Sequence, residues 1–221
     1  ARSLARRPQV LLLDEPLAAL DKKLRESTQH ELMELQRRLG MTFVVVTHDQ
    51  DEAMTMASRI GVMDAGRLEQ VASPRDLYEA PASRWIAEFV GDINLFEGQI
   101  GASEGGRLPV QTRDAGLLYV AEPRTPPART TVSVAIRPEK VKLSRRAPAA
   151  DGAGARAFNC LEGVITEVGY LGGLTTYKVT LDSGAVVRSS MANTTRIVDA
   201  YQASQRVAVW FTPDDCLVLE Q

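Results

Sequence analysis

The sequence has 221 residues, a length that corresponds to about 1.5 domains of ordinary size. Its 26 basic and 28 acidic side chains give a net charge of -2, which argues against a protein that binds nucleic acid through phosphate contacts. No apolar run approaches the ~18 residues of a membrane span, and the opening ARSLARRPQV lacks the apolar region of a signal peptide. We therefore expect a cytoplasmic protein that has no nucleic-acid partner.

Strand and helix signals alternate up to about residue 96. Val10–Leu13 is a continuous apolar run, which is typical of a parallel strand covered on both faces. Apolar residues recur at helical spacing over 21–39, and Gly40 follows as a C-terminal cap, so this segment predicts an amphipathic helix. Residues 41–47 predict a second buried strand. Together these elements form a strand–helix–strand unit with a right-handed crossover in one parallel sheet.

Three further elements are expected in this part of the chain. Asp49 and Glu52 have the spacing of a capping box and predict a short helix. The turn sequence at residues 64–66 lies between two short apolar strands and predicts a hairpin at the edge of the sheet. Ser73 is an N-cap residue and Pro74 suits the first helical position, so another helix begins there.

After residue 96 the helical periodicity gives way to short alternating runs that predict a small antiparallel β module. The clearest of these runs are 131–136, 177–181 and 206–211. Two segments rich in Pro, Ala and Gly, 123–129 and 145–156, predict surface loops. No repeat of fixed period is evident. The expected domains are therefore residues 1–96 and residues 97–221.

The two cysteines, Cys160 and Cys216, are far apart and have neither the spacing of a metal site nor that of a disulfide framework. Such cysteines are most often reduced thiols that pack as small apolar side chains. We therefore expect no redox or zinc chemistry.

Acidic side chains follow the first predicted strand, and a histidine follows the second. Asp14 and Glu15 come directly after the first apolar run, and His48 comes directly after the second. The carboxyl ends of parallel strands meet at one sheet edge, and neighbouring strands lie about 4.8 Å apart. We therefore expect His48 within reach of whatever the two acids hold. In phosphoryl-transfer sites one acid holds Mg²⁺ and a second orients and deprotonates water. Acids at the end of a strand can also simply begin a loop. The other histidine, His30, lies on the predicted helix and is interpreted as structural.

Three segments in the first 90 or so residues, LLLDEPLAALD, THDQDEAMTMASRI and GRLEQVASPRDLYEAP, resemble the ATP-binding subunit of ATP-binding-cassette (ABC) importers. This resemblance implies the C-terminal part of an α/β P-loop ATPase domain with a parallel sheet, with ATP and Mg²⁺ as cofactors. It identifies Asp14 as the Walker B acid that holds Mg²⁺ through water, and Glu15 as the catalytic base. Leu20 and Asp21 resemble the end of the D-loop, which reaches across the dimer to the nucleotide site. His48 resembles the switch histidine that senses the γ-phosphate. Asp21 could instead only cap its helix.

The second half resembles the accessory OB-like (TOBE) domain of sugar, iron and polyamine importers, most clearly in VAIRPEKVKL at 134–143. EFVGDINLFEG at 88–98 and DKKLR at 21–25 resemble the polyamine branch, which imports putrescine and spermidine. The resemblance implies a peripheral subunit on the inner face of the bacterial plasma membrane. Permease subunits would be its partners, and a periplasmic solute-binding protein would be an indirect one. In this family the ATPase subunit does not touch the cargo, so no residue is assigned to polyamine binding.

The sequence does not contain the phosphate-binding loop that such a site needs. None of its 16 glycines is followed by lysine, so the pattern G-x-x-x-x-G-K-[ST] does not occur. In the family that loop and the signature segment lie upstream of a stretch like residues 1–8, and the Arg-rich residues 2–7 read as a helix already in progress. We therefore expect part of a longer protein and predict that this chain alone does not hydrolyse ATP. A parallel sheet cut in this way has unpaired edges, so we expect a homodimer or a domain-swapped dimer.

Two other functions remain open at this point. The β half could be a small-ligand-sensing regulatory and dimerisation module of a sugar- or iron-importer ATPase. OB-like folds also bind single-stranded nucleic acid through basic grooves with stacking aromatic side chains. The second half of this chain has few aromatic residues, and the overall charge is not basic.

Overall fold

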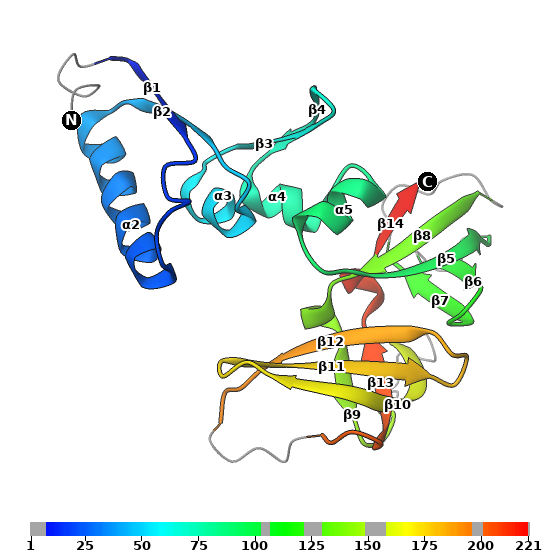
Figure 1. The fold of residues 1–221 in the computed structure, drawn as a ribbon. Helices are drawn as coiled ribbons and strands as arrows, with labels where there is room; N and C mark the ends of the chain where they lie inside the picture. The colour runs from blue at the N-terminus through cyan, green and yellow to red at the C-terminus, as the bar shows by residue number, and fades with distance from the viewer. Residues whose placement is uncertain (1–7, 103–106, 122–129, 149–157, 196–200, 221) are drawn as a thin grey trace. The chain divides into compact units, whose positions relative to one another are not determined.

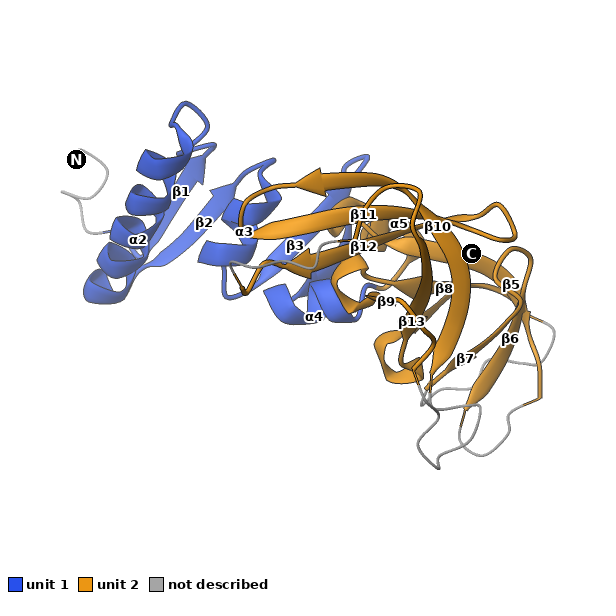
Figure 2. Ribbon diagram, turned by 90° about the horizontal axis from the view of Figure 1, so that it is seen from below, with its two compact units in different colours: residues 1–81 blue, residues 82–221 orange. Residues whose placement is uncertain are grey.

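The computed structural model describes residues 8–102, 107–121, 130–148, 158–195 and 201–220. It contains two compact units, residues 1–81 and 82–221 (Figures 1 and 2). The Arg-rich segment 2–7, the loop 123–129 and most of the loop 145–156 lie outside the described residues. The first unit is α/β and the second is mainly antiparallel β, so the predicted fold class is confirmed.

The first unit contains a parallel strand pair joined by a long helix (Figure 1). Strands β1 (Val10–Asp14) and β2 (Thr42–Val46) pair in parallel, with Val10 opposite Thr42, and helix α2 (Lys22–Leu39) connects them. Asp21 caps the start of α2, and Gly40 ends the helix with a φ of 62°, in the left-handed region that glycine adopts readily. The strand–helix–strand unit expected from the sequence is therefore present.

The strand pair buries only one of its two faces. Leu12 and Val46 are 74% and 59% exposed, whereas Leu11 and Phe43 on the opposite face are partly buried. Helix α2 lies beside the pair in both views (Figures 1 and 2). The expectation that both faces are covered is therefore wrong for the described residues. Both faces carry apolar side chains, so the sequence could not reveal which face is exposed.

The remaining elements of the first unit occur where the sequence predicted them. The hairpin, however, forms a two-stranded sheet of its own and does not extend the parallel pair, which corrects the expectation that it lies at the edge of that sheet. Ala65 and Gly66 make its turn with positive φ values of 44° and 80°. The elements are α3 (Gln50–Met56), β3 (Ile60–Asp64), β4 (Arg67–Ala72) and α4 (Pro74–Glu79).

The described residues of the second unit form two five-stranded antiparallel sheets and one α-helix, α5 (Arg84–Val90). The strands of the first sheet, in spatial order, are β14 (Leu217–Glu220), β8 (Thr131–Ile136), β5 (Asn94–Ile100), β6 (Leu108–Thr112) and β7 (Leu117–Val120). Those of the second sheet are β9 (Lys142–Ser144), β13 (Arg206–Phe211), β10 (Asn159–Tyr170), β11 (Leu174–Leu181) and β12 (Val186–Ala192). Two 3-10 turns precede β9 and β14: η1 (Pro138–Lys140) and η2 (Pro213–Asp215).

The two sheets are built from two similar halves of the chain. In the orders given above they correspond strand for strand, β5 to β10, β6 to β11, β7 to β12 and β8 to β13. The sequences correspond as well: NLFEGQI at 94–100 matches NCLEGVI at 159–165, and 131–144 matches 206–219 without a gap. Because the loops between these segments differ in length, the repeat has no fixed period.

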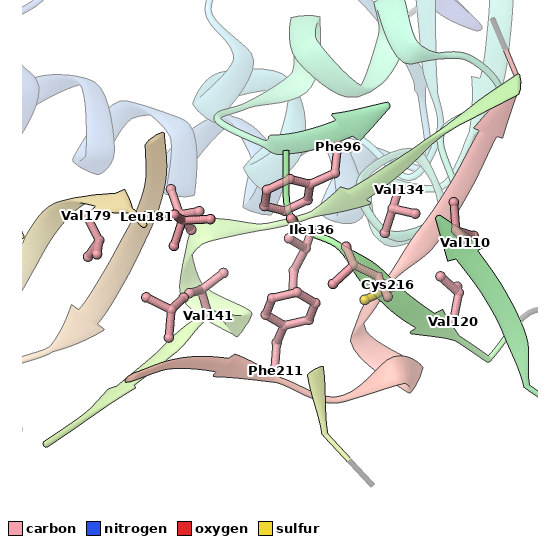
Figure 3. Close-up of a cluster of buried hydrophobic side chains, with 14 of the residues drawn as sticks. Phe96, Val110, Val120, Val134, Ile136, Val141, Val179, Leu181, Phe211 and Cys216 are labelled. Atoms are coloured by element: carbon pink, nitrogen blue, oxygen red, sulfur yellow. The ribbon is translucent and has the colours of Figure 1, made fainter. Parts of the chain in front are cut away.

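Each half supplies the last strand of the other half's sheet. Strand β9, from the first half, pairs with β13, and β14, from the second half, pairs with β8. One hydrophobic cluster contains buried side chains from both sheets, among them Phe96, Ile136, Val179 and Phe211 (Figure 3). The exchanged strands and the shared core make the two halves one folding unit.

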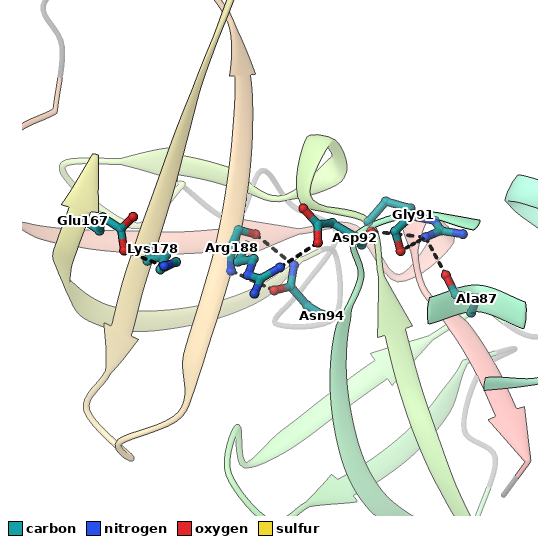
Figure 4. Close-up of polar contacts among 8 residues, drawn as sticks. Ala87, Gly91, Asp92, Asn94, Glu167, Lys178 and Arg188 are labelled. Atoms are coloured by element: carbon teal, nitrogen blue, oxygen red, sulfur yellow. Dashed lines mark hydrogen bonds and ion pairs between the residues drawn. The ribbon is translucent and has the colours of Figure 1, made fainter. Parts of the chain in front are cut away.

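Two equivalent asparagines connect the two sheets. Asn94 donates from Nδ2 to the carbonyl of Arg188 at 2.9 Å and accepts from its backbone N–H at 2.7 Å (Figure 4). Asn159 makes the same pair of bonds with Tyr119, both at 2.8 Å. Arg188 and Tyr119 lie on edge strands, so each asparagine satisfies backbone groups that would otherwise be open to pairing with another chain.

Helix α5 is attached to the sheets by Arg137, which is 2% exposed. Its Nη1 donates to the carbonyls of Ala87, Gly91 and Asp92 at 2.9, 3.0 and 3.2 Å (Figure 4). A cation at the C-terminal end of a helix is favoured by the helix dipole. Helix α5 thus belongs to the second compact unit, while the domain boundary at residue 96 stays a prediction.

Candidate functional site

The first site residues lie where β1 ends. Asp14 is the last residue of the strand and is exposed. Glu15 continues the parallel ladder for one more bond, because its N–H donates to the carbonyl of Val46 at 2.8 Å. Its φ is 42°, a left-handed value that is uncommon for a residue other than glycine. Such strained residues cluster at functional sites, and this one turns the chain out of the strand.

The structure brings His48 and Glu15 together, although they are 33 positions apart in the sequence. His48 Nδ1 lies 3.0 Å from Glu15 Oε1, and the two side chains are 75% and 51% exposed. An ionised carboxylate only accepts hydrogen bonds, so Nδ1 carries the proton in this contact and Nε2 stays available for another partner. The contact follows from the adjacency of the two parallel strands that end at these residues.

The contacts of Asp21 agree with the alternative interpretation, in which this residue caps its helix. Its Oδ1 accepts from the backbone N–H of Leu24 at 3.0 Å, so it is the N-cap of α2. Its assignment to the D-loop stays a prediction, as do the catalytic and metal-binding roles of Asp14, Glu15 and His48.

A bridging arginine beside this site was missed by the sequence reasoning. Arg25, near the start of α2, donates from Nη1 to Asp49 Oδ2 at 2.6 Å and from Nη2 to the carbonyl of Leu20 at 3.1 Å. Asp49 directly follows His48, and it caps α3 by accepting from the N–H of Glu52 at 3.1 Å. The only signal was the DKKLR segment, which indicated a family and not a contact.

The residues present fit Mg²⁺ only in combination with a nucleotide. Mg²⁺ in phosphoryl-transfer sites is usually held by one or two carboxylates together with substrate phosphates. Asp14 offers one exposed carboxylate, and the described residues contain no cluster of three or more side chains that could hold a metal ion. The sequence also lacks a P-loop pattern, so the phosphates have no cradle of that kind.

Within the described residues, no helix has the length and apolar character needed to cross a membrane.

Comparison with known proteins identifies similarity over both units. A family model described as the TOBE domain matches residues 134–219. The spermidine/putrescine import ATP-binding protein PotA of Trichodesmium erythraeum is 42% identical, over 100% of this chain and 58% of its own length. PotA of Trichormus variabilis is 39% identical, over 100% of this chain and 56% of its own length. The putrescine transport ATP-binding protein PotG of Escherichia coli is 39% identical, over 99% of this chain and 57% of its own length.

Among solved structures, the cytoplasmic molybdate-binding protein ModG aligns with 58% of this chain and 96% of its own length, with 14% identity and a TM-score of 0.48. That score is too low to support an argument about fold or ligand. The chain spans a little more than half the length of the curated relatives it matches. Along its whole length the chain is thus similar to ATP-binding subunits of polyamine ABC importers, and residues 134–219 match the TOBE domain model.

Proposed function

We propose that this chain is part of the ATP-hydrolysing subunit of an ABC importer that takes up polyamines, putrescine or spermidine. The observation that carries the proposal is the contact between His48 and Glu15 at the ends of two parallel strands. The similarity of 39–42% to polyamine-import ATP-binding proteins supports the cargo class.

In this proposal each residue has one task. Glu15 accepts a proton from the attacking water, and the contact with His48 orients its carboxylate. His48 presents Nε2 to the γ-phosphate, because Nδ1 is engaged by Glu15. Asp14 would hold Mg²⁺ when the ion is bound with the nucleotide, and Asp21 would lie in the loop that reaches the partner subunit. Bound Mg²⁺ supplies charge neutralisation at the phosphates.

Partners and location follow from the same proposal. The complete protein works as a homodimer on the inner face of the bacterial plasma membrane, bound to permease subunits and served indirectly by a solute-binding protein. The exposed apolar face of the strand pair, with Leu12 and Val46, supports association of the first unit with further protein. Sedimentation of the chain at high concentration tests dimer formation, and a monomer under those conditions would contradict it.

A chimera tests the importer role. This chain replaces the matching segment of PotG, and putrescine uptake is measured in an Escherichia coli strain that lacks PotG. We expect the chimera to restore uptake and its Glu15→Gln variant to lack it. If a chimera that is present at normal levels and hydrolyses ATP gives no uptake, the assignment to a polyamine permease is wrong.

A further inference from the structure

Arg25 joins the two chain segments that carry Glu15 and His48. Its Nη2 donates to the carbonyl of Leu20, in the segment between Glu15 and helix α2, and its Nη1 donates to Asp49, which directly follows His48. The two hydrogen bonds of Arg25 therefore link the segment that follows Glu15 to the residue that follows His48.

The segment that receives Arg25 is itself held in place. Asp49 uses Oδ1 to cap α3 at Glu52 and Oδ2 to accept from Arg25, so both oxygens are engaged. Its backbone N–H donates to Thr47 Oγ1 at 3.0 Å, which fixes the turn that contains His48. A contact to Asp49 thus acts on a residue that is also bonded to Thr47, on the other side of His48.

The chemistry of the bridge requires arginine. The guanidinium is a planar fork that can donate to two acceptors at once, whereas a lysine ammonium is a point charge on a flexible stem. The Nε of Arg25 is buried and has no hydrogen-bond partner among the described residues. An unsatisfied buried donor is costly. The two hydrogen bonds from the Nη atoms therefore have to offset this cost and hold the Arg25 side chain in place.

Burial distinguishes the bridge from the contact that it supports. The side chains of Arg25 and Asp49 are 32% and 28% exposed, whereas those of His48 and Glu15 are 75% and 51% exposed. Pairs that are exposed to water are weak and easily lost when their backbones move. The exposed pair therefore depends on contacts that hold the two segments together: the backbone bond from Glu15 to Val46 and the Arg25 bridge.

We infer that Arg25 is a positioning residue that holds the Glu15 segment against the His48 turn and thereby maintains the Glu15–His48 contact. Arg25 does not touch the reacting groups in this account. The inference rests on the proposed function only for the catalytic meaning of the contact, since the bridge itself can be tested in this chain without nucleotide.

The test uses imidazole nitrogen NMR of the ¹⁵N-labelled chain. The sequence contains two histidines, His30 and His48, so His30 on α2 is an internal reference. Spectra are recorded at one pH above the titration range of histidine, where the ¹⁵N shifts report which ring nitrogen carries the proton. In the wild-type chain we expect His48 to be protonated at Nδ1. Glu15→Met, which removes the acceptor, gives the reference spectrum for a broken contact.

The variants then separate the possible outcomes. Arg25→Met is expected to move the His48 signals most of the way to those of Glu15→Met, with His30 unchanged. Arg25→Lys is expected to behave like Arg25→Met, because lysine cannot make both contacts. Arg38→Met, an exposed position in the last turn of the same helix, is the control and is expected to match the wild-type spectrum.

Three results would overturn the inference. If Arg25→Met keeps the wild-type His48 signals while Glu15→Met changes them, the contact exists without the bridge, and the proposed function stands. If Arg25→Lys restores the wild-type signals fully, charge and not the two-way bridge is what matters. If Glu15→Met also leaves His48 unchanged, the contact itself is absent, and the proposed function loses its main support.

Discussion

The Nδ1 atom of His48 lies 3.0 Å from Oε1 of Glu15, and this contact joins the carboxyl ends of the parallel strands β1 and β2. It places a carboxylate and an imidazole side by side at the sheet edge where open α/β folds bind ligands. The backbone of Glu15 has a φ of 42°, a strained value for a residue other than glycine, at the residue that makes this contact.

This chain alone should not bind Mg-ATP in a calorimetric titration. The site residues include two carboxylates and a histidine, but the sequence has no G-x-x-x-x-G-K-[ST] loop whose amides and lysine would hold the phosphates. A Glu15→Gln variant should also show no binding. The chain lacks the groups that would bind the phosphates, and this substitution does not change that. Micromolar binding by either protein would show that phosphates are held without a P-loop and would contradict this account.

Replacement of Arg137 by methionine should destabilise the chain by about 2–4 kcal/mol, because three carbonyls at the end of α5, that of Ala87 buried, lose a charged donor. Urea unfolding monitored by circular dichroism measures the change in free energy. Arg146→Met, at an exposed position, is the matched control and should change stability by less than about 0.5 kcal/mol. Equal stability of the two variants would show that Arg137 does not anchor the helix.

The equivalent glycines Gly98 and Gly163 should respond alike to alanine. A Cβ at Gly98 would lie 2.6 Å from the carbonyl oxygen of Gln111, and one at Gly163 would lie 2.5 Å from that of Thr180. Both contacts are with the backbone of a neighbouring strand, so each substitution should cost about 1–3 kcal/mol in thermal or urea unfolding. Gly173→Ala meets nothing within 4 Å and should be nearly neutral. A neutral Gly163→Ala would contradict the tight pairing of β10 and β11.

Stability should fall with rising pH in the alkaline range because of Cys216. Burial, assisted by the charge of Asp215, raises the pKa of this thiol from 9.0 to about 12. Between these values the unfolded chain loses the proton while the folded chain keeps it, so folding becomes less favourable by about 1.4 kcal/mol per pH unit. Below pH 9 both states are protonated and the effect vanishes.

Cys216→Val isolates this effect, because Val141 is the corresponding residue of the first half of the module. The difference in unfolding free energy between wild type and variant should change steadily from about pH 9 to 12 in favour of the variant. A difference that stays constant over this range would mean that the thiol is not protected from ionisation.

The sequence predicted that Glu15 and His48 lie close together, because two apolar runs that end in acids and a histidine predict neighbouring parallel strands. The bridge through Arg25 was not accessible, since it joins positions 20, 25 and 49 through contacts that no local pattern encodes. The exposed face of Leu12 was also hidden, because an apolar run does not reveal how many layers cover it. The strand exchange between β9 and β14 depends on long-range pairing and was not predicted.

The two-half architecture was visible in the sequence only after the strands had been placed. NLFEGQI and NCLEGVI share the asparagine, the glutamate, the glycine and the isoleucine, but unequal loops separate them from the later matching segments. The structure explains which of these residues matter: the asparagines cap edge strands, and the glycines allow close strand pairing.

The ATPase rate of the purified PotG chimera, with and without Glu15→Gln, tests the central claim most directly. In the chimera the part of PotG outside the match supplies the P-loop that the family resemblance places there. We predict that the wild-type chimera hydrolyses Mg-ATP and that Glu15→Gln lowers kcat by about 10²–10⁴-fold, the typical contribution of a general base, while ATP binding is retained. Hydrolysis by the Glu15→Gln chimera at the wild-type rate would contradict the assignment of Glu15 as the catalytic base.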